Sequence, residues 1–130
     1  MSLPSSNAKT LGRIGRILDR KGEMIRLSLQ ACAHCAMCAD SCFKFRQSGR
    51  DPTFTPSYKM INSIGKIWRT RGQLTDDEFE DVRELAWDRC VLCMRCACPV
   101  GISIPSLMAL ARSACRERGV WRWYTTGRNA

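Results

Sequence analysis

Eight of the nine cysteines fall into two short groups whose spacing is typical of metal-binding loops. The first three members of each group are separated by two residues, and each matches its counterpart at a constant offset of 58 positions. Three thiolates at this pitch can point at one inorganic core, and a fourth cysteine near a proline typically binds the other cluster of a two-cluster protein. The groups are Cys32, Cys35, Cys38 and Cys42, then Cys90, Cys93, Cys96 and Cys98. Eight thiolates therefore predict two [4Fe–4S] clusters.

Zinc sites and disulfide bonds are the alternative uses for these cysteines. A zinc site built from two C-x2-C pairs would leave Cys38, Cys42, Cys96 and Cys98 unused, or would require a second and irregular zinc site. Disulfide bonds are typical of exported proteins, and the first residues do not have the pattern of an export signal. The spacing thus favours iron–sulfur clusters first, zinc second and disulfides last.

Length and composition predict a single domain in a reducing compartment. The chain has 130 residues, close to the most common domain size. Its short helices would bury a modest core, so we expect two clusters to act as internal cross-links. Their loss would remove much of the folding free energy. No run of 18 or more apolar residues is present, which argues against a membrane span. We expect the protein in the cytoplasm.

The charge balance is strongly basic, with 21 Lys and Arg against 12 Asp and Glu and a net charge of +9. Such a surface can suit nucleic acid, a membrane face or an acidic protein partner. A cubane held by four thiolates is negatively charged, so nearby cations would raise its reduction potential. The candidates are Lys44, Arg46, Arg89 and Arg95. The plainer alternative is a solvated basic face.

The amino-terminal third predicts a basic amphipathic helix over residues 11–29. Its apolar residues recur at spacings of three and four, and the helix is expected to be interrupted near Gly22. Residues 1–10 are polar and predict a frayed segment. The helix could lie on a membrane, but packing on this domain or on a partner is favoured.

The remaining elements are also predicted to be helical, since no segment alternates as a strand does. Residues 43–56 predict an irregular connector, and Pro56 opens a helix that Thr55 caps and that ends near Gly72. Thr75 and Glu78 predict a capping box for a helix that ends around Arg89, with an apolar stripe of Phe79, Val82, Leu85 and Ala86.

A last helix is predicted between Ser103 and Gly119, with Pro105 in its first turn. Its apolar side comprises Leu107, Met108, Leu110, Ala111 and Ala114. Cys115 lies on the same side and predicts a buried, inert thiol. The fold class is therefore all-α, with two cysteine loops between short helices. We divide the chain into an amino-terminal segment (1–22), a cluster-binding domain (23–118) and a tail (119–130).

The tail combines Trp121, Trp123 and Tyr124 with Arg122 and Arg128. Aromatic residues with arginine are typical of the residues that dominate protein interfaces, and contact with a partner is the favoured interpretation. The alternatives are packing on the domain itself and stacking on single-stranded nucleic acid.

Together, these segments resemble the α-helical ferredoxin fold, which also forms one domain of the iron–sulfur subunits of fumarate reductase and succinate dehydrogenase. The finer details resemble the C subunit of heterodisulfide reductase, its relatives in sulfur metabolism, and the ferredoxin-like amino-terminal part of sulfate-reduction electron-transfer subunits. The matching segments are CAHCAMCADSC (32–42), GRDPTFTPSYKM (49–60) and RCVLCMRCACPVGISIP (89–105). The resemblance covers roughly residues 23–118 and is more specific for fold and cofactor than for pathway.

The resemblance implies crossed ligation of the two clusters. Cys32, Cys35 and Cys38 would hold one cluster with Cys98, and Cys90, Cys93 and Cys96 would hold the other with Cys42. The chain departs from the family pattern because one residue, instead of three, separates Cys96 from Cys98. Cys98 is therefore the least certain ligand.

Two further positions bear on the ligand set. Phe43 follows Cys42 where the family commonly has a proline. His34 lies between Cys32 and Cys35, and its imidazole is a conceivable alternative ligand. A spacer that faces solvent, or a hydrogen-bond donor to a cluster sulfur, is the favoured role for His34.

The resemblance implies a non-catalytic electron-transfer subunit of a heterodisulfide-reductase-like complex. Its partners would be a flavin-containing A-like subunit and a cysteine-rich, B-like catalytic subunit that acts on disulfide or thiol sulfur. The chain has one histidine and no Gly-rich phosphate loop or nucleophile motif, so catalysis is not expected. The alternatives are a zinc- or cluster-stabilised basic module that contacts nucleic acid, and an autonomous ferredoxin.

Overall fold

Every regular element along residues 5–121, the part of the chain that this computed structural model describes, is helical. Side chains are described from residue 12 onward. The elements are α1 (Ser5–Ala31), η1 (Met37–Ser41), α2 (Phe43–Gln47), η2 (Pro52–Phe54), α3 (Pro56–Asn62), α4 (Ile64–Thr70), α5 (Asp76–Arg83), η3 (Glu84–Asp88) and α6 (Ile104–Arg118). Since no strand occurs in this part of the chain, the predicted all-α fold is confirmed.

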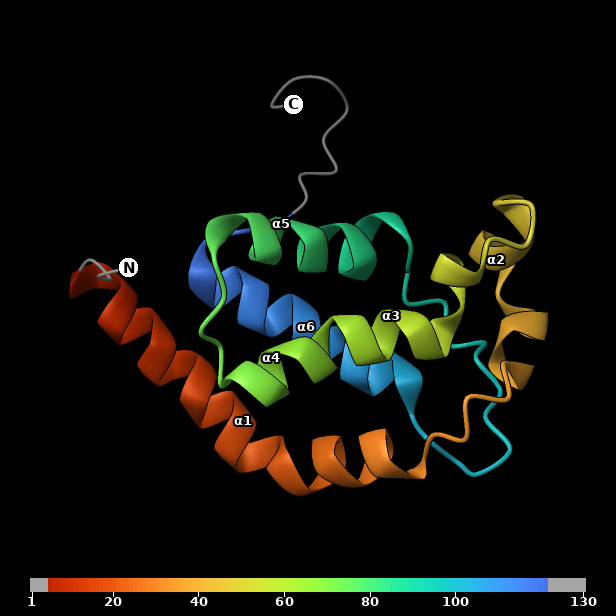
Figure 1. Ribbon diagram of the computed structural model, residues 1–130, viewed down its shortest axis with the longest axis horizontal. Coiled ribbons are helices and arrows are strands. Elements are labelled where there is room, and N and C mark those ends of the chain that lie inside the picture. The colour runs from red at the N-terminus through yellow and green to blue at the C-terminus, as the bar shows by residue number, and fades with distance from the viewer. Residues whose placement is uncertain (1–4, 122–130) are drawn as a thin grey trace.

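Helix α6 is the centre of the packing, because it contacts α1, α3, α4 and α5 (Figure 1). The predicted apolar stripe is confirmed, with Leu110 half-buried and its other members fully buried. Pro105 lies in the first turn, and Gly119 ends the helix in the left-handed conformation at φ 84°, as expected for a C-terminal glycine. Cys115 is fully buried, as predicted.

Helix α1 is continuous from Ser5 to Ala31, so the predicted interruption at Gly22 is wrong. The prediction of a frayed segment is also wrong for residues 5–10, which are helical. Gly22 instead allows close packing, because a Cβ there would lie 3.2 Å from two atoms of the Trp68 ring. The buried side of the helix carries Ile14, Leu18 and Ile25.

The helix predicted from Pro56 to Gly72 is divided into α3 and α4 at Ser63. Ser63 leaves helical geometry, with φ −113° and ψ −89°. Its hydroxyl donates a hydrogen bond to the carbonyl oxygen of Lys59 at 2.5 Å, a type of back-bonding that often bends helices. The predicted Pro56 start is confirmed, with Thr55 at the cap position but without a side-chain cap bond.

Helix α5 begins at the predicted capping box. The hydroxyl of Thr75 accepts from the Glu78 amide at 3.2 Å, and the Glu78 carboxylate accepts from the Thr75 amide at 2.9 Å. The predicted stripe of Phe79, Val82, Leu85 and Ala86 is buried. The helix continues into the π-helical turn η3, which ends just before Arg89.

The segment between the first cysteine group and α3 is more ordered than the predicted connector. It contains the short helix α2 and the 3₁₀ turn η2. Asp51 caps η2, because its carboxylate accepts hydrogen bonds from the amide and the hydroxyl of Thr53. These turns place Thr53 and Phe54 beside Arg89, whose side chain reaches the Thr53 hydroxyl and the Phe54 ring.

Both cysteine loops lie at the same end of the helical bundle (Figure 1). The first connects α1 to α2, and the second connects η3 to α6. Trp121 is half-buried and packs against the main core, so the self-packing alternative holds for this residue. Arg122, Trp123 and the rest of the tail lie outside the described residues.

Candidate metal centre

The eight predicted ligands divide into two sets of four around two separate hollows. The space lined by Cys32, Cys35, Cys38 and Cys98 is called the first hollow. The space lined by Cys42, Cys90, Cys93 and Cys96 is called the second hollow. Each hollow thus combines three cysteines from one loop with one from the other loop. This partition matches the crossed arrangement that the resemblance implied.

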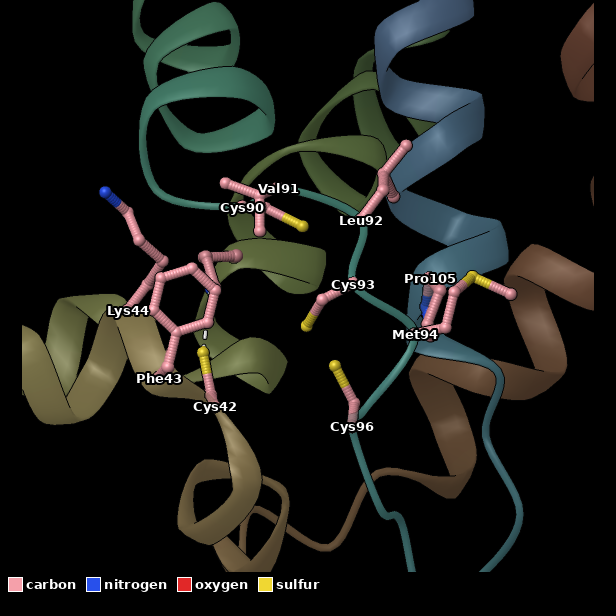
Figure 2. A pocket seen from close by; sticks show the side chains of 11 residues that line it. Cys42, Phe43, Lys44, Cys90, Val91, Leu92, Cys93, Met94, Cys96 and Pro105 are labelled. Atoms are coloured by element: carbon pink, nitrogen blue, oxygen red, sulfur yellow. Dashed lines mark hydrogen bonds between the residues drawn. The ribbon is translucent and has the colours of Figure 1, made fainter.

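The second hollow is formed where the second cysteine loop passes the start of α2. The sulfur atoms of Cys90, Cys93, Cys96 and Cys42 point toward one common space (Figure 2). Cys42 lies immediately before α2 and is 6% exposed, whereas Cys93 is exposed. The apolar side chains of Phe43, Val91 and Met94 form its outer rim, and all three are exposed.

The first hollow is formed between the end of α1 and the segment that leads into α6. Cys32 follows α1 directly, and Cys38 lies in η1. Cys98 reaches this hollow together with Pro99, Val100, Ile102 and Ile104. The short spacing after Cys96 therefore does not keep Cys98 away, because residues 90–103 form a loop and the two cysteines serve different hollows.

The two cysteine loops have the same backbone turns at equivalent positions. In the first loop His34 and Ala36 have φ of 57° and 62°, and in the second loop Leu92 and Met94 have φ of 55° and 67°. Residues other than glycine rarely adopt this left-handed conformation, and it tends to occur at functional sites. Alternation of right- and left-handed residues turns amide N–H groups inward to form anion-binding nests, which are common at iron–sulfur sites.

His34 lies on the wall of the first hollow but is exposed to solvent. The hollow already has four cysteines, so the imidazole is not needed to complete a set of four ligands. His34 also has a backbone role, because its left-handed conformation forms part of the turn between Cys32 and Cys35.

A buried lysine beside the second hollow was not singled out from the sequence. Lys59 is 2% exposed, and its ammonium donates to the sulfur of Cys42 at 3.5 Å and to the carbonyl oxygen of Arg89 at 2.6 Å. A buried charge is costly unless it is paired. No carboxylate pairs with Lys59 within residues 12–121, so its available counter-charge is the group of thiolates around the hollow.

The basic residues predicted to compensate cluster charge are placed differently from one another. Lys44 lines the second hollow, whereas Arg46 and Arg95 are exposed. The guanidinium of Arg89 is bonded to Glu84 at 2.7 Å and to the hydroxyl of Thr53 at 2.7 Å. Arg89 therefore acts on the second hollow more directly through its carbonyl oxygen, which holds the Lys59 ammonium, than through the charge of its guanidinium.

Arg112 fixes the start of the second cysteine loop from helix α6. Its guanidinium donates to the carbonyl oxygens of Ala86 at 2.8 Å and Cys90 at 2.7 Å. It also lies over the ring of Trp87 at 5.2 Å from the centroid. These contacts tie Cys90 to the core, so the first ligand of the second loop is positioned by packing.

Burial changes the acidity of several thiols. It raises the pKa of Cys96 to about 12, with Cys90 and Cys42 adding to the rise and Lys59 opposing it. Burial also raises the pKa of Cys38, while hydrogen bonds from the backbone and hydroxyl of Ser57 act in the opposite direction. Metal ligation needs thiolates, so iron binding at these sites must release protons.

The donor set fits iron–sulfur clusters better than single zinc ions. All eight thiols are free of disulfides and are arranged as two sets of four. Within residues 12–121, no three His, Cys, Asp or Glu side chains are arranged to hold a single metal ion. Four thiols around each shared space, and the buried cation of Lys59 at the second hollow, suit an anionic cluster.

A comparison with protein families identifies the class of protein. Residues 28–102 match the model of the 4Fe-4S dicluster domain. This match spans more than half of the chain and includes all eight cysteines of the two hollows, so the chain belongs to that family. Neither the comparison with curated proteins nor that with solved structures found a match.

Membership of this family gives the chain an iron–sulfur electron-transfer role with [4Fe–4S] chemistry. Along residues 5–121, no helix has the length and apolar character required to cross a membrane.

Proposed function

We propose that this chain is an electron-transfer subunit that carries two [4Fe–4S] clusters with crossed ligation. One observation carries the proposal: the eight cysteines separate four and four around two hollows, each completed by a cysteine of the other loop. In this assignment the first cluster is held by Cys32, Cys35, Cys38 and Cys98. The second is held by Cys42, Cys90, Cys93 and Cys96.

The surroundings of the cysteines favour electron transfer over substrate binding. Bound clusters of this type supply one-electron transfer, and hydrogen bonds to their sulfurs and their exposure to solvent set the potential. With four thiolates in each set, no position is reserved for a substrate. Apolar side chains line both hollows, with Ile102 and Ile104 in the first and Phe43 and Met94 in the second.

The crossed arrangement also gives the clusters a structural role. Each set joins residues separated by tens of positions in the sequence, so each cluster closes a long loop of chain. Metal binding is then coupled to folding. We expect iron removal to release both cysteine loops from the bundle.

We further propose that the complex is of the heterodisulfide-reductase type. The support is the resemblance over residues 32–42, 49–60 and 89–105. The chain would relay electrons between a flavin-containing A-like subunit and a cysteine-rich B-like catalytic subunit that acts on disulfide or thiol sulfur, in a sulfur-oxidising context. We propose the cytoplasm as its compartment, because cysteines that are not paired in disulfide bonds suit a reducing environment.

Iron and acid-labile sulfide analysis of anaerobically purified protein tests the proposal. Two clusters predict about eight iron and eight sulfide per chain, with broad visible absorption that dithionite bleaches. A colourless protein that contains zinc would overturn it. About seven iron would indicate one three-iron cluster, and Cys98 would then be the first ligand to test by substitution.

A further inference from the structure

Two side chains at the start of helix α3 approach different hollows. Ser57 lines the first hollow together with Cys38, and its backbone and hydroxyl groups oppose the rise in the pKa of that thiol. Lys59 lines the second and donates to the sulfur of Cys42 at 3.5 Å. Both are buried, at 9% and 2% exposure. One rigid helical turn therefore presents a neutral donor to one hollow and a cationic donor to the other.

The rest of each lining strengthens this difference in charge. Among the side chains described, those of residues 12–121, no lysine or arginine lines the first hollow. The wall of the second hollow includes Lys44 as well as Lys59. The guanidinium of Arg112 is also near the second hollow, because it donates a hydrogen bond to the carbonyl oxygen of the ligand Cys90 at 2.7 Å.

The position of Lys59 makes its effect larger than that of a surface cation. Its ammonium is removed from solvent, so water and salt screen its field weakly. The carbonyl oxygen of Arg89 holds it at 2.6 Å, which fixes its distance from Cys42. A fixed positive charge favours the more negative, reduced state of a neighbouring cluster, and hydrogen bonds to a ligand sulfur act in the same direction.

We propose that Lys59 makes the second hollow the higher-potential cluster site, so that a single electron entering the subunit resides there and not at the first hollow. This inference rests on the proposed function and adds an order to its two clusters. Each step adds one electron, supplied by a flavin or iron–sulfur donor, and no covalent bond forms or breaks. The electron is then held beside the exposed rim of Phe43, Val91 and Met94.

The test is an anaerobic redox titration of the purified chain, with each reduced cluster followed by electron paramagnetic resonance. The wild-type chain should show two separated one-electron steps. Lys59→Met keeps the length of the side chain and removes its charge. It should make reduction at the higher step at least about tenfold less favourable, which is about 59 mV for a one-electron couple, and should leave the lower step in place.

Two matched variants separate the local effect from a general loss of charge. Lys21→Met removes one exposed cation from α1 and should move neither step. Ser57→Ala should lower only the lower-potential step, and by less than Lys59→Met lowers the other. Ser57→Ala also keeps the proposal testable if Lys59→Met fails to assemble its cluster, because a shift of the higher step would overturn the assignment.

Other results would also contradict the inference. Coincident wild-type steps, a shift of the lower step in Lys59→Met, or unchanged potentials in a fully loaded Lys59→Met would each show that Lys59 does not order the clusters. Failure of the proposed function is distinguishable, because iron and sulfide analysis before the titration would then find no clusters in the wild-type chain.

Discussion

Cys96 and Cys98 are separated by a single residue, yet their side chains line different hollows. The chain between η3 and α6 is not helical there, so it can pass between the hollows and contribute to both. The short spacing between Cys96 and Cys98, which made Cys98 the least certain ligand in the sequence, therefore lets one segment supply a cysteine to each hollow. The same peptide segment contributes to the lining of both sites.

Substitution of single cysteines should distinguish ligands from the buried thiol. Cys98→Ser should lower iron content through its effect on the first hollow alone, because the site loses one thiolate. Cys115→Ser should leave iron and sulfide unchanged, since this thiol is fully buried between helices and lines neither hollow. Equal iron content in the wild type and Cys98→Ser would contradict the ligand set.

The cysteine spacing and the helix ends could be predicted because their causes are local. A capping box needs only Thr75 and Glu78, three positions apart, and Gly119 ends α6 through its own backbone freedom. The cysteine partition was predicted through a resemblance, since spacing alone gives the number of thiolates and not which hollow each one faces.

Gly22 was misjudged and Lys59 was not singled out, because the roles of both depend on residues that are distant in the sequence. Gly22 does not interrupt α1, since the Trp68 ring packs against it from another helix. Ser63 was also missed, because the apolar positions on either side of it fit a single continuous helix. The sequence around Lys59 gives no sign of a buried ammonium, and only the fold brings Arg89 and Cys42 to it.

Loss of the capping box should destabilise the domain by a moderate amount. Thr75→Ala removes the hydroxyl that accepts from the Glu78 amide, which typically costs about 1 kcal/mol. Thr75→Ser retains the hydroxyl and should stay close to the wild type. Anaerobic denaturant unfolding measures both, and equal stability of the Ala and Ser variants would show that the cap does not contribute.

The same helix end should make stability depend on acid pH. The hydrogen bond from the Thr75 amide lowers the pKa of Glu78 in the folded chain. Its contribution is therefore complete above the unfolded pKa of about 4.3 and is lost as pH falls through the folded pKa. Thermal unfolding should show an advantage of wild type over Glu78→Gln that shrinks on acidification. An advantage that is constant with pH would contradict this.

Alanine at two glycines of α1 should have different effects. Nothing lies within 4 Å of a Cβ at Gly15, whereas a Cβ at Gly22 would lie 3.2 Å from the Trp68 ring. Gly15→Ala should stabilise the chain by about 0.5–1 kcal/mol through helix propensity and chain entropy. Gly22→Ala should stabilise the chain less than Gly15→Ala does, because the Trp68 ring must move to make room for the new Cβ. Equal gains in unfolding experiments would show that Gly22 has no packing role.

Anomalous X-ray scattering at the iron edge, measured on anaerobically grown crystals, tests the central claim most directly. The account predicts two separate four-iron clusters, one bonded to Cys98 together with the cysteines of the first loop, and one bonded to Cys42 together with those of the second. A single cluster, zinc in place of iron, or a first cluster held without Cys98 would contradict the crossed arrangement.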